Sequence, residues 1–223
     1  RHTAAQLGID FVSVDMTDSL EQSVIQPFIS GYACGMTPIP CILCNPAVKF
    51  RLLFEQADRL GAFYVATGHY ARIGRTSEGV PALYRSPAAN DQAYMLYRLP
   101  CAWLNRLLLP LGEEKSKADI RARAKEAGID VFDKPDSMEI CFIPDEDYAG
   151  FIESRGVCPP PGDFIDAQGN VLGRHQGIHR YTVGQRRGLG IAAEGRLYVT
   201  RIDPQTNRVV LALTDPYRAQ ITL

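Results

Sequence analysis

Hydrophobic and polar residues follow two patterns along the first half of the chain. Residues 9–16 (IDFVSVDM) are apolar and rich in β-branched side chains, which predicts a strand buried on both faces. Residues 18–31 instead carry apolar side chains at helical spacing. The short apolar run at 63–67 (FYVAT) predicts a second strand. Strands that alternate with helices in this way indicate a parallel sheet flanked by helices.

A second helix is expected between these strands. Asn45 is a residue type that caps helix N-termini, and Pro46 would stand at the first helical position, where its missing N–H costs nothing. Gly61 suits the C-terminal stop after the apolar face ends at Leu60. The pattern therefore predicts a helix that begins at Pro46, with Cys44 directly ahead of its N-terminus.

The second half of the chain differs from the first in composition and in the secondary structure that it predicts. Ser116 and Asp119 match a capping box, and Gly128 matches a helix stop, so a helix is predicted over about 117–127. From Pro144 onward prolines and glycines recur, and residues 196–213 form two strand-like runs around a turn. We predict a small antiparallel β domain joined to the α/β part near residues 142–144.

The composition of the chain argues against a secreted disulfide-rich protein and against a membrane protein. The 223 residues carry a formal net charge of −1 and six cysteines, too few for a secreted disulfide scaffold. No apolar run approaches the length of a membrane span, and no secretory leader is recognisable, so a reduced cytoplasmic protein without membrane contact is expected. Nucleic-acid binding would need a local patch. One candidate, with a solvated basic face as its alternative, comprises Arg174, His175, His179, Arg180, Arg186 and Arg187, which have no acid between them.

The cysteines are the main candidates for chemistry. At a helix N-terminus Cys44 would be biased toward thiolate, but the macrodipole contributes only ~0.3–1 kcal/mol, less than one pKa unit. A second group is therefore required. Cys141 lies in a short apolar run and reads either as that partner or as a buried structural cysteine. A structural zinc bound by Cys41 and Cys44 would need a second pair of cysteine or histidine ligands at similar spacing, which the sequence does not contain. Core or incidental roles remain for Cys34, Cys101 and Cys158.

Six blocks of sequence, in order, resemble the tRNA-specific 2-thiouridylases. They are residues 35–50, 66–72, 90–100, 109–129, 134–144 and 177–191. The resemblance implies an α/β, parallel-sheet ATP-pyrophosphatase domain (adenine nucleotide alpha hydrolase-like), incomplete at its N-terminus, over 1–143. A small β domain that binds tRNA would follow at 144–215, and the start of a C-terminal β domain at 216–223.

The resemblance also implies a reaction. ATP, with Mg, would adenylate the 2-carbonyl oxygen of the wobble uridine in tRNA, and sulfur from a cysteine persulfide would replace that oxygen. Cys44 is similar to the family nucleophile and Cys141 to the persulfide carrier, which a sulfur-donor protein would charge. Cys44 would either release sulfide by forming a disulfide with Cys141 or assist the attack of the persulfide.

Further site residues are implied by the same resemblance. Gly68 is similar to the ATP contact at the end of a strand, and His69 beside it is expected to be a hydrogen-bonded structural histidine. The loop beside the target base corresponds to Ile39, Pro40 and Cys41. Contacts to tRNA correspond to Asn90, Asp91, Gln92, Arg186 and Arg187, of which the first three read on composition alone as a polar loop.

The sequence also departs from the family pattern. The Ser-Gly-Gly-x-Asp-Ser loop that cradles pyrophosphate is not found among the 223 residues, so we expect no pyrophosphate release from ATP by this stretch alone. A cysteine at position 41, where some members have Asp, leaves open an iron–sulfur cluster on Cys41, Cys44 and Cys141 as a different route to thiolation. A non-catalytic tRNA-binding remnant is a further alternative.

Overall fold

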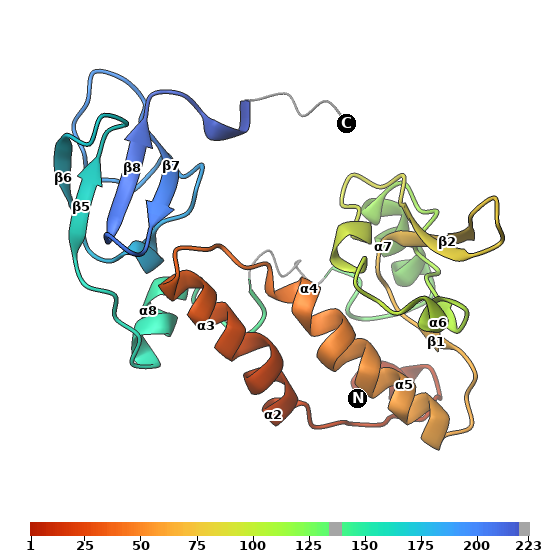
Figure 1. The fold of residues 1–223 in the computed structure, drawn as a ribbon. Helices are drawn as coiled ribbons and strands as arrows, with labels where there is room; N and C mark the ends of the chain where they lie inside the picture. Colours follow the sequence, from red (N-terminus) through yellow and green to blue (C-terminus); the bar gives the residue numbers. More distant parts are fainter. Residues whose placement is uncertain (134–139, 219–223) are drawn as a thin grey trace. The chain divides into compact units, whose positions relative to one another are not determined.

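The computed structural model describes residues 1–133 and 140–218, and side chains as far as residue 217. The chain divides into two compact units, which are described separately: Arg1–Val24 with Pro40–Met138, and Ile25–Ile39 with Glu139–Leu223. Figure 1 labels the main helices and strands. No helix in the described ranges has both the length and the apolar composition needed to cross a bilayer.

The first unit contains most of the helices and two small sheets. Its elements are α1 (His2–Gln6), α2 (Thr17–Leu20), α4 (Pro40–Cys44), the π-helical η2 (Asn45–Lys49), α5 (Phe50–Arg59), β1 (Val65–Ala66), β2 (Ala71–Arg75), β3 (Pro81–Arg85), the 3₁₀ turn η3 (Ala93–Met95), α6 (Cys101–Leu104), β4 (Leu107–Leu108) and α7 (Lys117–Glu126). The helix predicted over 18–31 is found as α2, the π-helical η1 (Glu21–Ile25) and α3 (Gln26–Ala33).

The helix that carries Cys44 starts earlier than predicted. It begins at Pro40, runs through α4, η2 and α5, and ends before Gly61, whose φ of +69° fits the expected stop. Cys44 has helical backbone angles (φ −61°, ψ −44°), so the prediction that Asn45 caps a helix beginning at Pro46 is wrong. Pro46 lacks an N–H and its ring crowds the carbonyl four residues earlier. The wide π turn accommodates that crowding, so the helix continues through the proline.

A parallel strand pair forms in the first unit, as predicted. β1 lies parallel to β4, with Val65 opposite Leu107 and Ala66 opposite Leu108. β2 and β3 form an antiparallel hairpin that the sequence did not predict. The core beneath these strands consists of Phe50, Phe54, Ala57, Val65, Ala71, Leu96, Leu99, Leu104 and Leu107. One face of the Cys44 helix, on its α5 segment, is therefore fixed against the strands.

The strand predicted over residues 9–16 is wrong. No strand is present there, and Ile9, Phe11 and Val12 are 61%, 51% and 51% exposed. A strand buried on both faces needs a hydrogen-bonded neighbour and covering layers. Among the described residues none pairs with this segment. An apolar run alone cannot provide those neighbours.

The helix predicted over 117–127 is confirmed as α7. Ser116 is its N-cap, and its Oγ accepts a hydrogen bond from the Ala118 N–H at 3.1 Å. Asp119 lies in the first turn, where a carboxylate is favoured by the helix dipole. Gly128 follows with φ +71°, the left-handed conformation that ends helices.

The second unit is built on a four-stranded sheet in the order β6-β5-β8-β7 (Figure 1). Its elements are α3, α8 (Tyr148–Ser154), β5 (Gly162–Ile165), β6 (Val171–His175), the 3₁₀ turn η4 (Ile178–Arg180), β7 (Tyr198–Asp203), β8 (Arg208–Ala212) and the 3₁₀ turn η5 (Pro216–Arg218). The β7–β8 hairpin is the one predicted around the turn in 196–213. The sheet is mixed, because β5 and β8 are parallel. The prediction of an antiparallel β domain is confirmed for the pairs β5–β6 and β7–β8 and wrong for β5–β8, because a long connection between β6 and β7 replaces a hairpin.

Candidate active site and tRNA interface

Cys44 is half-buried in the helix of the first unit, and the residue after it ties this helix to a distant loop. Asn45 is 1% exposed, and its side-chain Nδ2 donates a hydrogen bond to the Met95 carbonyl at 2.9 Å. The Asn45 Oδ1 is buried and has no hydrogen-bond partner among the described residues. Met95 closes the turn η3, which directly follows the predicted tRNA-contacting residues Asn90–Gln92. The structure thus places two predicted site segments next to each other.

The segment that contains Gly68 is tied to the same loop. The Tyr70 N–H donates to Gln92 Oε1 at 2.9 Å, and the Gln92 N–H donates to the Tyr70 carbonyl at 2.8 Å. Gly68 itself is exposed at the carboxyl end of β1, the edge where open α/β sheets hold ligands. The Cys44 helix, the Gly68 segment and the Gln92 loop are therefore joined by hydrogen bonds within one unit.

His69 has the packed, hydrogen-bonded position expected of a structural histidine. Its ring packs against Phe50 with 5.5 Å between centroids and 32° between the ring planes, and its Nδ1 lies 2.9 Å from the Thr67 hydroxyl. Burial, with a smaller contribution from the nearby Lys49 ammonium, lowers the pKa of His69 from 6.5 to about 4. The imidazole is therefore uncharged at neutral pH, so it has no extra proton to donate as a general acid.

This lowered pKa predicts a pH-dependent contribution to stability. His69 binds a proton less readily in the folded chain than in the unfolded chain, so between pH 6.5 and 4 the unfolded state gains protons first. The free energy of unfolding should therefore fall as the pH drops through that window. His69→Gln should remove this part of the pH dependence, which urea titrations at pH 7 and pH 5 would detect. Equal pH dependence in the variant and the wild-type chain would contradict the assignment.

The predicted tRNA contacts Asn90–Gln92 differ in what their side chains do. Asp91 Oδ1 accepts the Ser86 N–H at 2.8 Å, so its carboxylate folds the loop, as the Gln92 side chain does. Asn90 is exposed and lines a shallow hollow together with Lys115 and Lys117. Of the three, Asn90 is the one whose side chain faces solvent beside basic residues.

The predicted target-base loop leads into the Cys44 helix. Ile39 is about half exposed, Pro40 is the buried first residue of α4, and Cys41 is exposed. Cys41 and Cys44 stand three residues apart on a helix, so they share one face. The assignment of this loop to the target base stays a prediction.

Cys141 is exposed in a turn of the second unit. Its neighbours are not: Phe142 packs edge-on against Phe28 at 5.5 Å between centroids, and Ile143 is buried. The alternative of a buried structural cysteine at 141 is therefore wrong. The core alternative is equally wrong for Cys34, Cys101 and Cys158, which are all exposed. Residues 134–139 of the block around Cys141 lie outside the described residues, and the meeting of Cys44 with Cys141 stays a prediction.

The structure offers no support for a metal at these cysteines. In residues 1–133 and 140–218 no group of three or more His, Cys, Asp or Glu side chains is arranged to hold an ion. The zinc and iron–sulfur alternatives therefore gain no observation in their favour.

The predicted basic patch is smaller in the structure than in the sequence. His175 and His179 are buried, and the Nε2 of His179 lies 2.8 Å from Glu153 Oε1. The same carboxylate oxygen accepts a hydrogen bond from Arg180, and a carboxylate of β5 pairs with Arg174. The hydrogen bond from His179, followed by the hydrogen bond and the charge of Arg180, holds the pKa of Glu153 below its usual value. The sequence showed no acid within the patch because these acids come from other elements.

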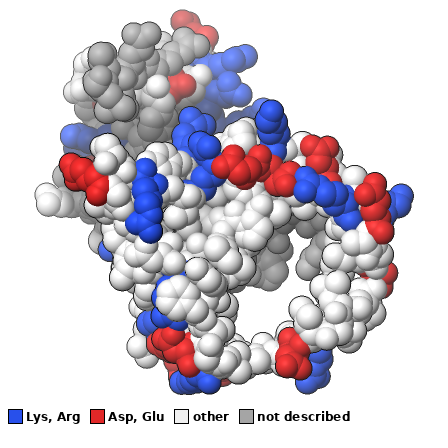
Figure 2. Space-filling model, turned by 90° about the vertical axis from the view of Figure 1, so that its right-hand side faces the viewer, with Lys and Arg blue, Asp and Glu red and all other residues white. Residues whose placement is uncertain are grey.

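Arg186 and Arg187 are the members of the patch that are exposed and form no ion pair within the described residues. Across the face shown in Figure 2, basic and acidic side chains lie interspersed, as a net charge of −1 would suggest. Binding of a polyanion would therefore depend on local groups such as this arginine pair.

Comparison with known proteins identifies the class to which the chain belongs. Residues 1–145 match the family model described as the tRNA methyl transferase HUP domain, and residues 150–213 match the tRNA methyl transferase PRC-barrel domain. The chain belongs to this family. A HUP domain followed by a small PRC-barrel domain also confirms the predicted fold class: an ATP-pyrophosphatase-like α/β domain, then a small β domain.

Individual relatives carry a more specific name. The tRNA-specific 2-thiouridylase MnmA of Lachnoclostridium phytofermentans is 46% identical over 217 residues, 96% of this chain and 60% of that protein. The MnmA proteins of Clostridium acetobutylicum and Xanthobacter autotrophicus are 45% and 48% identical and are covered over 59% and 53% of their lengths. The resemblance to the 2-thiouridylases is thus confirmed, and the chain spans about 60% of the length of the first of these relatives.

Proposed function

We propose that this chain carries the two cysteines of a tRNA-uridine 2-sulfurtransferase, which replaces the 2-oxygen of the wobble uridine with sulfur in an ATP-dependent reaction. The observation that carries this proposal is the hydrogen-bonded junction within the first unit. It joins the Cys44 helix, through Asn45, to the turn after Gln92, and joins Gln92 to the segment containing Gly68. The nucleophile Cys44, the nucleotide contact Gly68 and the tRNA contact at Gln92 would then belong to one hydrogen-bonded frame.

The residues present are compatible with a nucleotide at Gly68. A Cβ at this position would meet only the Leu111 side chain at 3.6 Å, so the exposed backbone there is open to a close ligand. ATP, when bound with Mg, supplies adenylation of the uridine oxygen, which turns a poor leaving group into a good one. Gly68 would hold the nucleotide at the carboxyl edge of β1, beside the Gln92 loop.

The cysteines would supply the sulfur. A sulfur-donor protein would leave Cys141 as a persulfide, for which its exposed turn gives access. In one route the Cys44 thiolate attacks the inner sulfur of Cys141, forming a disulfide and expelling hydrosulfide, which adds to C2 of the activated uridine and displaces AMP. In the other route the terminal persulfide sulfur adds to C2 first and displaces AMP. Cys44 then attacks the inner sulfur, which releases the thiouridine and forms the same disulfide.

The family description names methyl transfer, whereas the relatives are named for thiolation. The site residues favour sulfur. Cys44 stands inside the joined frame and Cys141 is exposed for charging by a donor, and a persulfide relay needs two such thiols. We therefore propose that the reaction is a sulfur transfer and that it takes place in the reducing environment of the cytoplasm.

The test is complementation by the complete gene product that contains this chain. A bacterial strain that lacks wobble 2-thiouridine would receive the gene, and its tRNA nucleosides would be analysed by mass spectrometry. Restored 2-thiouridine is the expected result. A methylated uridine without thiolation, or unmodified uridine despite soluble expression, would refute the proposal.

A further inference from the structure

We propose that Arg186 and Arg196 of the second unit form a clamp for one phosphate group of the RNA backbone. This inference rests on the proposed function, because it assumes that the chain binds tRNA. Arg196 was not among the residues that sequence analysis selected. It lies ten residues beyond Arg186, and the glycine-rich stretch between the two arginines conceals their proximity in the sequence.

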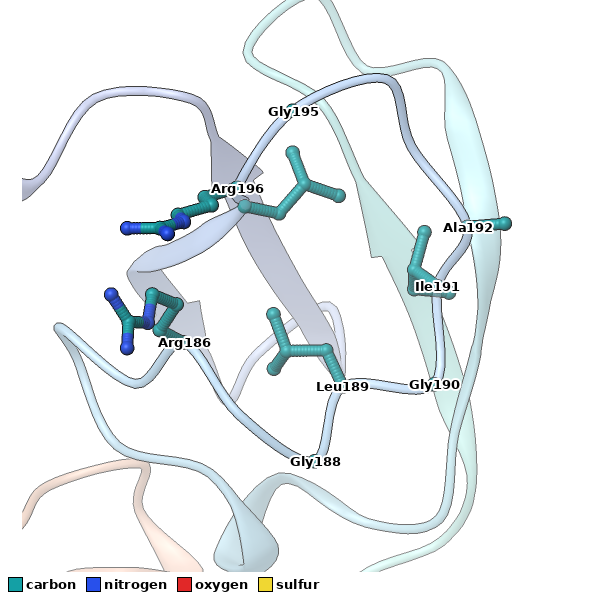
Figure 3. A pocket seen from close by; sticks show the side chains of 9 residues that line it. Arg186, Gly188, Leu189, Gly190, Ile191, Ala192, Gly195 and Arg196 are labelled. Carbon is teal, nitrogen blue, oxygen red and sulfur yellow. The ribbon is translucent and has the colours of Figure 1, made fainter.

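The two arginines line one hollow of about 550 Å³. Its other lining residues are Gly188, Leu189, Gly190, Ile191, Ala192, Gly195 and Leu197. Figure 3 shows both arginine side chains extending to the same side of the hollow, with their guanidinium groups next to each other, while Leu189 and Ile191 lie farther in. The hollow therefore has a cationic rim beside an apolar wall.

The arginine pair lacks the carboxylate partner that several other arginines of the chain have. Arg106, Arg123 and Arg180 each form an ion pair. Within the described residues neither Arg186 nor Arg196 has such a partner, and no acidic side chain lines the hollow. Two adjacent guanidinium groups repel each other unless an anion lies between them. The arrangement is that of an anion site, and a phosphate oxygen pair matches the planar fork of each guanidinium.

The backbone that carries the pair is held by hydrogen bonds to β7. The Gly184 N–H donates to the Val199 carbonyl at 2.7 Å, and the Val199 N–H donates to the Gln185 carbonyl at 2.9 Å. The Gln185 side chain also bridges the turn, accepting from the Thr182 N–H at 3.0 Å and donating to the Arg187 carbonyl at 3.0 Å. These bonds hold the backbone on both sides of Arg186, so less ordering of this side chain is needed when a phosphate binds.

Two glycines of the hollow, Gly188 and Gly190, leave the backbone uncovered. Gly188 and Gly190 have φ of +74° and +66°, in the left-handed region that favours glycine. A Cβ at Gly190 would meet nothing within 4 Å, and one at Gly188 only the end of the Gln185 side chain at 3.9 Å. A ribose-phosphate chain could thus approach the main chain closely, while the apolar wall accommodates a sugar or base edge.

Carboxylates lie in two neighbouring hollows. Asp166 and Glu194 line one of them, and Asp215 lines the other together with Arg196, but none of the three lines the hollow with Arg186. The Oδ1 of Asp215 accepts the Tyr217 N–H at 3.0 Å, so the carboxylate is engaged with its own turn. Arg196 thus stays directed to the rim that it shares with Arg186 (Figure 3).

The salt dependence of tRNA binding tests the clamp. An unmodified tRNA transcript with a wobble uridine would be titrated with the chain and with Arg186→Gln, Arg196→Gln and the double variant, by fluorescence anisotropy at several salt concentrations. Each single change should weaken binding about tenfold and lower the slope of log K against log salt by about 1. The double variant should lose less than the product of the singles, because both arginines would hold one phosphate.

Arg174→Gln is the matched control. It removes the same charge from the same unit, but Arg174 lies on β6, does not line the hollow and pairs with Asp163, so its loss should change binding about twofold or less. Circular dichroism would confirm that all variants fold. Clamp variants that bind like Arg174→Gln, in a chain that does bind tRNA, would overturn the clamp alone. No tRNA binding by the wild-type chain would instead overturn the proposed function on which the clamp rests.

Discussion

Serine in place of Cys44 or Cys141 is expected to abolish 2-thiolation in the complete enzyme, with a loss of at least about a hundredfold in rate. A hydroxyl at position 141 cannot carry a persulfide, and a hydroxyl at position 44 cannot attack sulfur at neutral pH. Binding of tRNA should change about twofold or less, since neither change alters a charge that holds phosphate. Thiouridine formation would be followed with donor, ATP and tRNA in a single-turnover assay.

Cys34→Ser and Cys158→Ser are the matched controls for this experiment. Both thiols are exposed like Cys141, and neither has a role in the proposed relay. Both variants should keep full activity. An active Cys44→Ser or Cys141→Ser enzyme would refute the relay. A Cys44–Cys141 disulfide, trapped after turnover without reductant and located by peptide mapping, would support it.

Alanine at Gly112 is expected to destabilise the first unit severely. An added Cβ would lie 2.2 Å from the Ala71 carbonyl oxygen and 3.1 Å from that of Leu109, and both are backbone atoms that no side-chain rotation can move. Gly112 and Ala71 are buried where β2 begins, so the overlap would separate packed segments. Overpacking of this kind costs about 3 kcal/mol or more, which a urea unfolding titration would measure.

Gly68→Ala is the comparison that isolates this effect. Its added methyl group would make only an ordinary contact with Leu111, so the free energy of unfolding should change by about 0.5 kcal/mol or less. The same variant should weaken ATP binding in the complete enzyme if Gly68 is the nucleotide contact. Similar stability of the Gly112→Ala and wild-type chains would show that the approach of Gly112 to β2 is not required.

Local signals in the sequence predicted local structure well. Ser116 and Gly128 mark the two ends of α7 because capping depends on hydrogen bonds and backbone angles within a few residues. The same kind of signal was misleading at Asn45 and Pro46. A proline is compatible with the first turn of a helix, but it is also compatible with a π turn inside a longer one, and the sequence alone does not separate the two.

Features that depend on distant residues were predicted less well. The segment 9–16 is apolar enough for a central strand, yet a strand requires partners that its own sequence cannot supply. The charges of Arg174 and Arg180 are offset by Asp163 and Glu153, which other elements contribute. The approach of Arg196 to Arg186 likewise depends on how the chain returns to β7. The candidate site was found through family blocks, and its hydrogen-bonded frame came from the structure.

The π-helical turn η2 (Asn45–Lys49) determines which side of the helix Cys44 lies on. A regular α-helix advances by about 100° per residue, so one extra residue in a turn offsets everything before it by about that angle. Phe50 and Phe54 fix the later part of the helix against the strands. The π turn at Pro46 therefore sets the direction in which the Cys44 sulfur points. A sequence that formed a regular α-helix here would turn the thiol toward a different neighbour and leave the core residues in place.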